Sequence, residues 1–220
     1  MALSREKVLD AALRLASEHG LAGLSMRKLA AELGVEAMSL YNHVANKGDL
    51  LDGLTARVFE SVPLPAPGPW DSRLRELTVG LYSAFSRHPV VVRALATDQA
   101  NPRSVGALKF IDAMLTALLD AGLSERDAAR GYRSLMGLIF GAVLTESVGL
   151  SGGVSEAGGS DVRGSEVRAE PVDAWFQRLV TARELPALHR VLPSMLDGDC
   201  LQDFEFQLDL LIGGLGASVR

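Results

Sequence analysis

The 220-residue chain carries 22 lysine and arginine residues against 27 aspartate and glutamate residues, a formal net charge of −5. This balance argues against a nonspecific binder of polyanions, although a few clustered cations can still hold specific phosphates. Hydrophobic residues make up 48%, which is typical of a globular protein with a sizeable core. The one cysteine, Cys200, rules out an internal disulfide. Charges from Arg5 to Asp10 argue against a signal peptide, so we expect a cytoplasmic protein without a membrane span.

The first predicted elements are helices over residues 4–19 and 26–33, followed by a second short helix that ends near Val44. Leu40 and Val44 of this helix are expected to face the core. Ser25 is a suitable N-cap, and Gly34 can take the positive φ that ends a helix. Helix, glycine and second helix form the helix–turn–helix pattern, which commonly reads DNA. Plain helical hairpins share this pattern, so these residues alone leave both interpretations open.

The rest of the chain is also predicted to be helical. A fourth helix over residues 47–62 precedes four prolines within residues 63–69, which cannot continue a helix and form a semi-rigid spacer. We place the boundary there, between a head of residues 1–62 and a body of residues 70–220. The uncharged stretch 134–145 should be buried nearly all round. The body helices are predicted over residues 70–86, 102–121 (with Pro102 at the start), 124–148, 172–184 and 186–193, with a flexible loop over 149–171. Asp199 is predicted to cap the last helix.

Residues 4–62 resemble the DNA-binding domain of the TetR family of bacterial repressors, and its tetracycline-repressor branch above all. The likeness is carried, in order, by residues 23–30 (GLSMRKLA), 33–36 (LGVE), 39–41 (SLY), 43–44 (HV), 46–47 (NK) and 50–52 (LLD). The resemblance implies an all-α fold, with a helix–turn–helix head on a helical effector-binding body. It also implies a homodimer, joined by a four-helix bundle, that binds a palindromic operator and is released by a small-molecule effector.

The resemblance assigns roles in the head by position. The residues expected to meet bases are Arg27, Ala37, Met38, Ser39, Asn42 and His43. Those expected to hold phosphates are Ser25, Lys28, Tyr41 and Lys47. Arg27 flanks the two-helix unit together with Lys28 and Lys47, so its charge is a further source of local phosphate contacts. For Tyr41 and His43, packing against the fourth helix remains an alternative. Three of the base-reading residues differ from those of the tetracycline-repressor branch, so we expect a different operator.

The body offers apolar side chains that could line an effector pocket with few polar groups. The candidates are Phe85, Phe110, Ile111, Met114, Met136, Phe140 and Trp175. Core packing is the simpler explanation for each of them taken alone. Glu146 resembles the glutamate that helps to hold drug-bound magnesium in the tetracycline-repressor branch, but Leu138 stands where that branch has a histidine. We therefore expect no metal and no cofactor, only an effector of unknown identity.

Motifs of common enzyme classes are missing from the sequence: it has no HExxH, no P-loop and no nucleophile elbow. Its four histidines show no metal-ligand spacing. We therefore expect a transcriptional repressor and not an enzyme, with operator DNA, an effector and a second copy as partners and no membrane. Two alternatives stay open: a carrier of small apolar ligands, and a regulator that activates or needs a corepressor.

Overall fold

The computed structural model describes residues 3–97, 100–147, 183–196 and 198–218, and the regular structure within these ranges is entirely helical. The all-α prediction is therefore confirmed. The predicted loop 149–171 and most of the helix predicted over 172–184 lie outside the described residues. The helices are α1 (Arg5–Gly23), α2 (Met26–Leu33), α3 (Ala37–Leu40), α4 (Lys47–Glu60), α5 (Trp70–Arg87), α6 (Pro89–Ala96), α7 (Val105–Asp120), α8 (Glu125–Ser147), α10 (Pro186–Leu196) and α11 (Cys200–Ala217).

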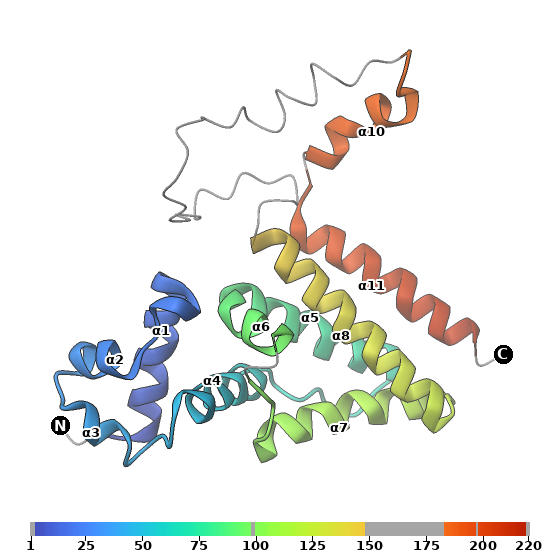
Figure 1. Ribbon diagram of the computed structural model, residues 1–220. Coiled ribbons are helices and arrows are strands. Elements are labelled where there is room, and N and C mark those ends of the chain that lie inside the picture. The colour runs from blue at the N-terminus through green and yellow to red at the C-terminus, as the bar shows by residue number, and fades with distance from the viewer. Residues whose placement is uncertain (1–2, 98–99, 148–182, 197, 219–220) are drawn as a thin grey trace. The chain divides into compact units, whose positions relative to one another are not determined.

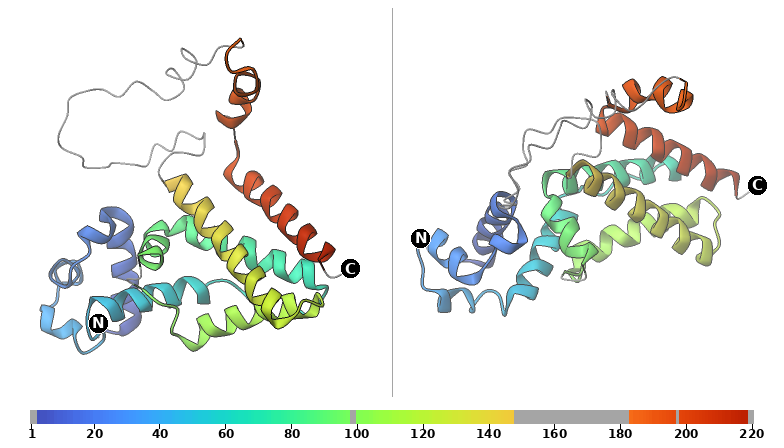
Figure 2. Two further views of the ribbon diagram at one scale, coloured as in Figure 1. Left: turned by 45° about the vertical axis from the view of Figure 1, so that its right-hand side comes forward. Right: turned by 45° about the horizontal axis from the view of Figure 1, so that its top comes forward.

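The chain divides into two compact units, one of residues 1–144 with 207–220 and one of residues 145–206. Within the first unit, α1, α2 and α3 lie together, and α4 runs from them toward α5, α6 and α7 (Figures 1 and 2). None of the helices among the described residues is long and apolar enough to cross a membrane.

The first helix begins where the sequence predicts. The Ser4 hydroxyl accepts a hydrogen bond from the backbone N–H of Lys7 at 3.3 Å, which caps the first turn of α1. The helix is interrupted at Gly20, whose φ of 67° places it in the left-handed region. The apolar face of α1, formed by Val8, Ala12, Leu15 and Ala16, is buried and lets α1 pack against α2, α4 and α6.

Gly34 joins α2 to the segment that leads into α3, and its φ is 65°. The backbone N–H of Gly34 donates to the Ala31 carbonyl at 3.2 Å, and that of Val35 donates to the Ala30 carbonyl at 3.0 Å. These bonds close the end of α2 and redirect the chain, as predicted from the glycine.

Replacing Gly34 by alanine should lower the free energy of unfolding by about 1–2 kcal/mol, because a side chain is disfavoured at positive φ. The space around Gly34 is open, so the cost comes from the backbone alone. Chemical denaturation at fixed protein concentration measures the change. Gly34→Asn is the matched control and should lose less, since asparagine tolerates this conformation. Equal losses for the two variants would contradict the prediction.

Helix α4 is shared by the head and the body. Its first turn is capped by Asn46, whose Oδ1 accepts the backbone N–H of Asp49 at 2.9 Å. Leu50, Leu54 and Phe59 are at most 2% exposed. These side chains face two sides at once, because α4 packs against α1 and also against α5, α6 and α7. A movement of α4 therefore disturbs the cores of both parts.

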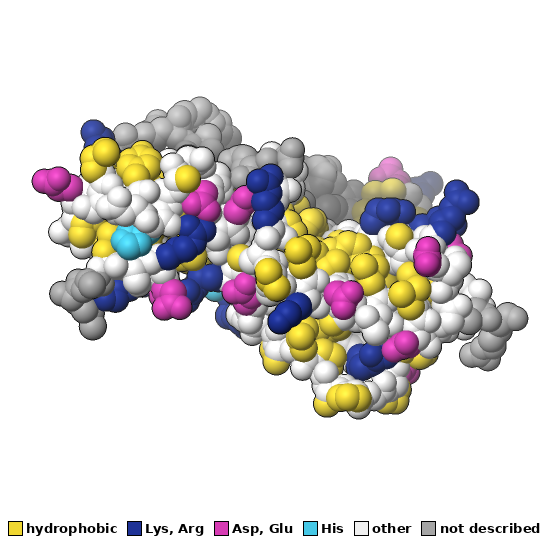
Figure 3. All heavy atoms as spheres, turned by 90° about the horizontal axis from the view of Figure 1, so that it is seen from below, with side chains coloured by type: hydrophobic (Ala, Val, Ile, Leu, Met, Phe, Trp, Pro, Cys, Tyr) yellow, Lys and Arg dark blue, Asp and Glu magenta, His cyan; other side chains and the backbone are white. Residues whose placement is uncertain are grey.

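Helix α7 turns an apolar face outward. Its N-cap is Ser104, so it begins at Val105 and not at Pro102 as the proline suggested. Val105 and Leu108 are 71% and 54% exposed. Seen from below, the face that carries α7 shows hydrophobic side chains gathered together (Figure 3).

The prediction that residues 134–145 are buried nearly all round is wrong for the single chain. Leu135, Ile139 and Val143 are buried, but Gly137 and Gly141 are exposed and face open space. The physical reason is that one chain covers only one side of α8. An apolar helix with an open, small-residue face is suited to a second helix at close range.

The last helices differ from the prediction at one point. We expected Pro193 to end the short helix, but α10 continues through it to Leu196. A proline removes one helical N–H, and the neighbouring turns can still carry the helix past it. The predicted cap of α11 is confirmed, since Asp199 accepts the backbone N–H groups of Leu201 and Gln202 at 2.9 and 3.1 Å.

Candidate functional site

The residues predicted to meet bases are partly exposed on one side of the head. Met38 is 73% exposed, and Arg27 and Asn42 are also exposed. Ala37, Ser39 and His43 are half-buried. Leu40 and Val44, which were predicted to face inward, are at most 1% exposed and anchor this segment. The arrangement leaves an apolar thioether and polar groups free to enter a groove.

The second helix of this unit is shorter than predicted. It spans only Ala37–Leu40, and its N-cap residue Glu36 makes no side-chain capping bond. The chain then continues as a turn, in which the backbone N–H groups of His43 and Val44 both donate to the Leu40 carbonyl at 2.9 Å. Asn42 and His43 therefore belong to a turn that follows the helix, and not to the helix itself.

Two predicted phosphate contacts also have structural roles. The Ser25 hydroxyl accepts the backbone N–H of Lys28 at 3.2 Å, and the Lys47 ammonium donates to the Leu21 carbonyl at 3.0 Å. The Ser25 O–H and the other ammonium N–H groups of Lys47 stay available to a phosphate oxygen. Lys28 is exposed, and Tyr41 is 46% exposed, which disagrees with full packing of its ring against α4.

Arg5 was not predicted to take part, yet its guanidinium reaches the turn after α3. It donates to the His43 carbonyl at 2.5 Å and to both carboxylate oxygens of Asp49 at 2.8 and 3.2 Å. The bond from Arg5 lowers the pKa of Asp49 below its usual value, so this carboxyl is ionised at neutral pH. The two residues are 44 positions apart, and no sequence spacing indicates such a pair.

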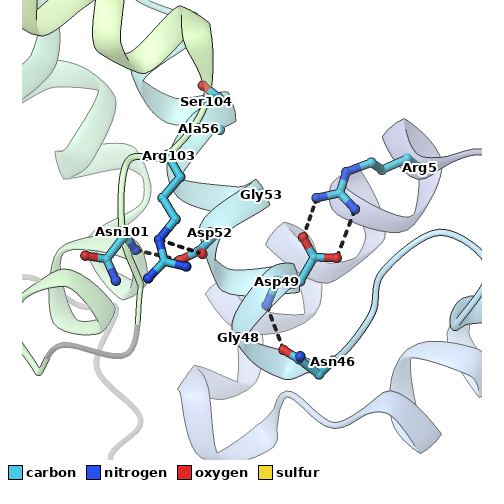
Figure 4. Close-up of a pocket in the computed structure, with 10 residues that line it drawn as sticks. All are labelled: Arg5, Asn46, Gly48, Asp49, Asp52, Gly53, Ala56, Asn101, Arg103 and Ser104. Atoms are coloured by element: carbon cyan, nitrogen blue, oxygen red, sulfur yellow. Dashed lines mark hydrogen bonds and ion pairs between the residues drawn. The ribbon is translucent and has the colours of Figure 1, made fainter.

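A polar cavity of about 600 Å³ lies where α1, the first turns of α4 and the segment before α7 meet (Figure 4). The Asp52 carboxylate accepts the backbone N–H of Asn101 at 2.6 Å, and the Arg103 guanidinium lies 3.7 Å from it. At the end of α4, Glu60 accepts a hydrogen bond from the Ser104 hydroxyl at 2.7 Å. Two carboxylates of α4 are thus tied to the segment between α6 and α7.

Three of the predicted effector residues belong to one aromatic cluster with Phe59, a side chain that was not predicted to take part. Phe59 of α4 lies edge-on to Phe85 and Phe110, with ring centroids 5.6 and 5.5 Å apart, and Phe140 lies 5.8 Å from Phe85. Phe59, Phe85 and Phe110 are at most 2% exposed. This Phe59 cluster joins α4 to α5, α7 and α8 through apolar contacts.

The other predicted effector residues are distributed differently. Met114 is fully buried, and Ile111 and Met136 are half-buried. Trp175 lies outside the described residues. Glu146 belongs to the second unit, where it helps to raise the pKa of the Cys200 thiol, a shift caused first by burial.

Some buried polar atoms of the first unit have no hydrogen-bond partner. They include Oγ1 of Thr55, which is fully buried on α4, and Nδ1 of His88 between α5 and α6. Burial lowers the pKa of His88, and the neighbouring Arg87 lowers it further, so the imidazole is neutral at pH 7. Such atoms can bond a ligand that brings a complementary group. Within the described ranges, His, Cys, Asp and Glu side chains form no group of three or more that could hold a metal ion.

Both parts of the chain match known protein families. Residues 8–54 match the bacterial regulatory proteins of the tetR family, and residues 62–219 match the tetracyclin repressor-like C-terminal domain. The crystal structure of the TetR family protein ActR from Streptomyces coelicolor, in complex with actinorhodin, has a similar fold. Its TM-score is 0.78 at 27% identity, and the match covers 100% of this chain and 99% of that chain.

Curated relatives extend the likeness at the level of sequence. The class C tetracycline repressor protein of Escherichia coli is 32% identical over 215 residues, 97% of this chain and 90% of that protein. The transcriptional repressor DrrR1 of Streptomyces coeruleorubidus is 32% identical over 148 residues, which cover 66% of this chain and 54% of the relative. The chain thus matches about half of the length of DrrR1.

Proposed function

Because the chain belongs to the TetR family of bacterial regulatory proteins, we propose that it is a transcriptional repressor that binds a palindromic operator and is released by a small molecule. The observation that carries this proposal is the exposed Met38 on a segment anchored by the buried Leu40 and Val44. The family match over residues 8–54 covers this segment, so the exposed side chains around Met38 lie in the part of the chain that resembles the bacterial regulators.

In the proposed complex, α3 and the turn after it enter the major groove. Met38 and Ala37 meet thymine methyl groups, while Ser39, Asn42 and His43 form hydrogen bonds with base edges. Arg27, Lys28 and Lys47 lie around this surface and meet phosphates, which position the head without reading the sequence.

A homodimer would give two such heads the symmetry of a palindrome. Its support in the structure is the open side of α8, where Gly137 and Gly141 face empty space, and the similar exposure of Gly213 and Gly214 on α11. Small residues let helices approach closely, as a four-helix bundle between two copies requires.

The effector is proposed to act through α4. An apolar molecule that enters next to Phe85 or Phe110 has to part rings that contact Phe59, so its binding energy acts directly on α4. The unpaired Thr55 hydroxyl is a candidate hydrogen-bond partner for such a molecule. Coupling between an effector and DNA of about 1–3 kcal/mol is enough to change operator affinity by 5- to 150-fold. No metal or cofactor is part of this proposal.

The relatives are regulators of transcription, and we propose accordingly that the chain has no catalytic role and works in the cytoplasm, where bacterial DNA lies. Activation, or repression that needs a corepressor, uses the same surfaces with the opposite response to the ligand. A carrier protein would bind a small apolar ligand but would not bind DNA.

Selection of bound sequences from random duplex DNA by the purified full chain tests the proposal. We expect enrichment of a two-fold palindrome, with half-sites separated by one or more helical turns. The enriched duplex then serves as the probe for effector screening. A folded dimer that enriches no sequence would contradict the repressor proposal for the ligand-free form and favour the carrier or the corepressor-dependent regulator.

A further inference from the structure

Arg5 connects three parts of the head that are distant in sequence. It projects from the first residue of α1. Its guanidinium meets the carbonyl of His43, at the end of the reading segment (residues 37–43, which comprise α3 and the start of the turn after it), and the carboxylate of Asp49, in the first turn of α4. Figure 4 shows the two forked bonds between the guanidinium and the carboxylate. The His43 carbonyl lies within the turn that joins α3 to α4, and Asp49 lies just after that turn.

The Asp49 carboxylate extends this arrangement into the turn itself. Its Oδ2 also accepts the backbone N–H of Ala45 at 2.8 Å, while its own backbone N–H donates to Asn46. The carbonyl of His43 and the N–H of Ala45 are thus both held from outside the turn. With α3 only one turn long, the segment that carries Asn42 and His43 is held by these bonds in addition to the buried side chains of Leu40 and Val44.

We propose that Arg5 and Asp49 are positioning residues for DNA reading, which hold the segment after α3 at a fixed orientation to α4 without touching DNA themselves. This inference rests on the proposed function and adds two residues to it. The fork of a guanidinium suits the role, because its N–H groups are fixed in one plane and can serve a carbonyl and a carboxylate together.

A contribution to stability alone does not account for the pair. The side chains of Arg5 and Asp49 are 45% and 33% exposed, and ion pairs at such positions stabilise a fold little. Their geometric precision matters where a turn has to present side chains to base edges within hydrogen-bond distance. The pair therefore affects the orientation of the reading segment more than the stability of the head.

The charge of Asp49 allows a test in which a positioning role and its absence predict opposite changes in operator affinity. A carboxylate near a phosphate backbone repels DNA, so its neutralisation in Asp49→Asn should strengthen binding if Asp49 has no positioning role. Positioning predicts the opposite, because an amide holds Arg5 and the Ala45 N–H less strongly than a carboxylate does. Glu6→Gln removes the same charge from the neighbouring exposed position and is the matched control.

The experiment measures the affinity of the full-length variants for the palindrome selected by the wild type, at two salt concentrations, with the melting temperature as a check on folding. We expect Asp49→Asn and Arg5→Lys each to weaken binding by about tenfold, comparable to one lost base contact, with an unchanged salt slope. Glu6→Gln should bind as tightly as the wild type or more tightly.

Other outcomes would contradict either the positioning role of Arg5 and Asp49 or the proposed function itself. Asp49→Asn binding that equals or exceeds that of the wild type would overturn the inference. Arg5→Lys binding with wild-type affinity, together with a salt slope reduced in Arg5→Gln, would show that Arg5 itself holds a phosphate, which also overturns it. If the wild type selects no palindrome, the proposed function fails before the positioning of its reading segment is at issue.

Discussion

Replacing Phe59 by alanine is expected to lower the free energy of unfolding by about 3–5 kcal/mol, the usual cost of removing a buried aromatic ring. Phe59 is 2% exposed and lies edge-on to two other rings, so its loss leaves a cavity between α4, α5 and α7. Chemical denaturation at one fixed protein concentration measures the change, since the stability of an oligomer depends on concentration.

Two controls make this result specific to the Phe59 cluster. Phe59→Leu fills most of the same volume and should lose clearly less than Phe59→Ala. Leu64→Ala changes an exposed side chain just after α4 and should stay within about 0.5 kcal/mol of the wild type. A loss below 1 kcal/mol for Phe59→Ala, roughly the mean for any point mutation, would show that α4 and the body are not held together by this cluster.

Operator affinity is expected to fall by about a thousandfold between 50 and 200 mM salt, in spite of the net negative charge of the chain. Arg27, Lys28 and Lys47 surround the reading segment and are exposed. In a dimer these cations would neutralise about six phosphates, which gives a slope of log affinity against log salt of roughly −5. Titration of the selected duplex at several salt concentrations measures this slope.

The double variant Lys28→Gln with Lys47→Gln removes about four of these six charges. Its slope should shrink to roughly −2, so that the same change of salt costs only about tenfold. The control is Lys109→Gln on α7, whose slope should equal that of the wild type. It is a single variant because the sequence has too few lysines away from α2 and α4 for a matched double variant. A wild-type slope near zero would contradict the assigned phosphate contacts.

Local signals in the sequence predicted the ends of several helices. Ser25 caps α2, Gly34 ends it, and Asp199 caps α11, because each of these residues bonds or turns the backbone within a few positions of itself. Burial of Leu40 and Val44 followed from helical spacing. The family resemblance was confirmed by matches over both parts of the chain.

Other features depend on tertiary packing, for which one sequence holds no local signal. The early end of α3 at Leu40 is one such feature, since no glycine or proline in the sequence marks it. The Arg5–Asp49 pair joins residues far apart in sequence, and Phe59 was only one apolar position among several on its helix. For α8, an apolar face covered by its own chain and one covered by a second copy have the same sequence pattern.

The assigned site residues differ in what supports them. The exposure of Met38, Asn42 and Lys28 agrees with their predicted contacts with DNA, which remain predictions. Among the effector candidates, Phe85, Phe110 and Phe140 lie together, but complete burial of two of them fits core packing equally well. Only a ligand that displaces these rings would separate the two roles.

The brevity of α3 has a consequence for how easily the head opens locally. A helix of one turn forms too few hydrogen bonds to offset the cost of its own nucleation, so its shape is maintained by the rest of the head. Segments of this kind open without global unfolding and exchange their amide hydrogens readily with solvent. The shape of the surface proposed to meet the bases therefore depends on the contacts that hold this segment, those of Arg5 and Asp49 among them, and an opening that breaks these contacts also releases that surface.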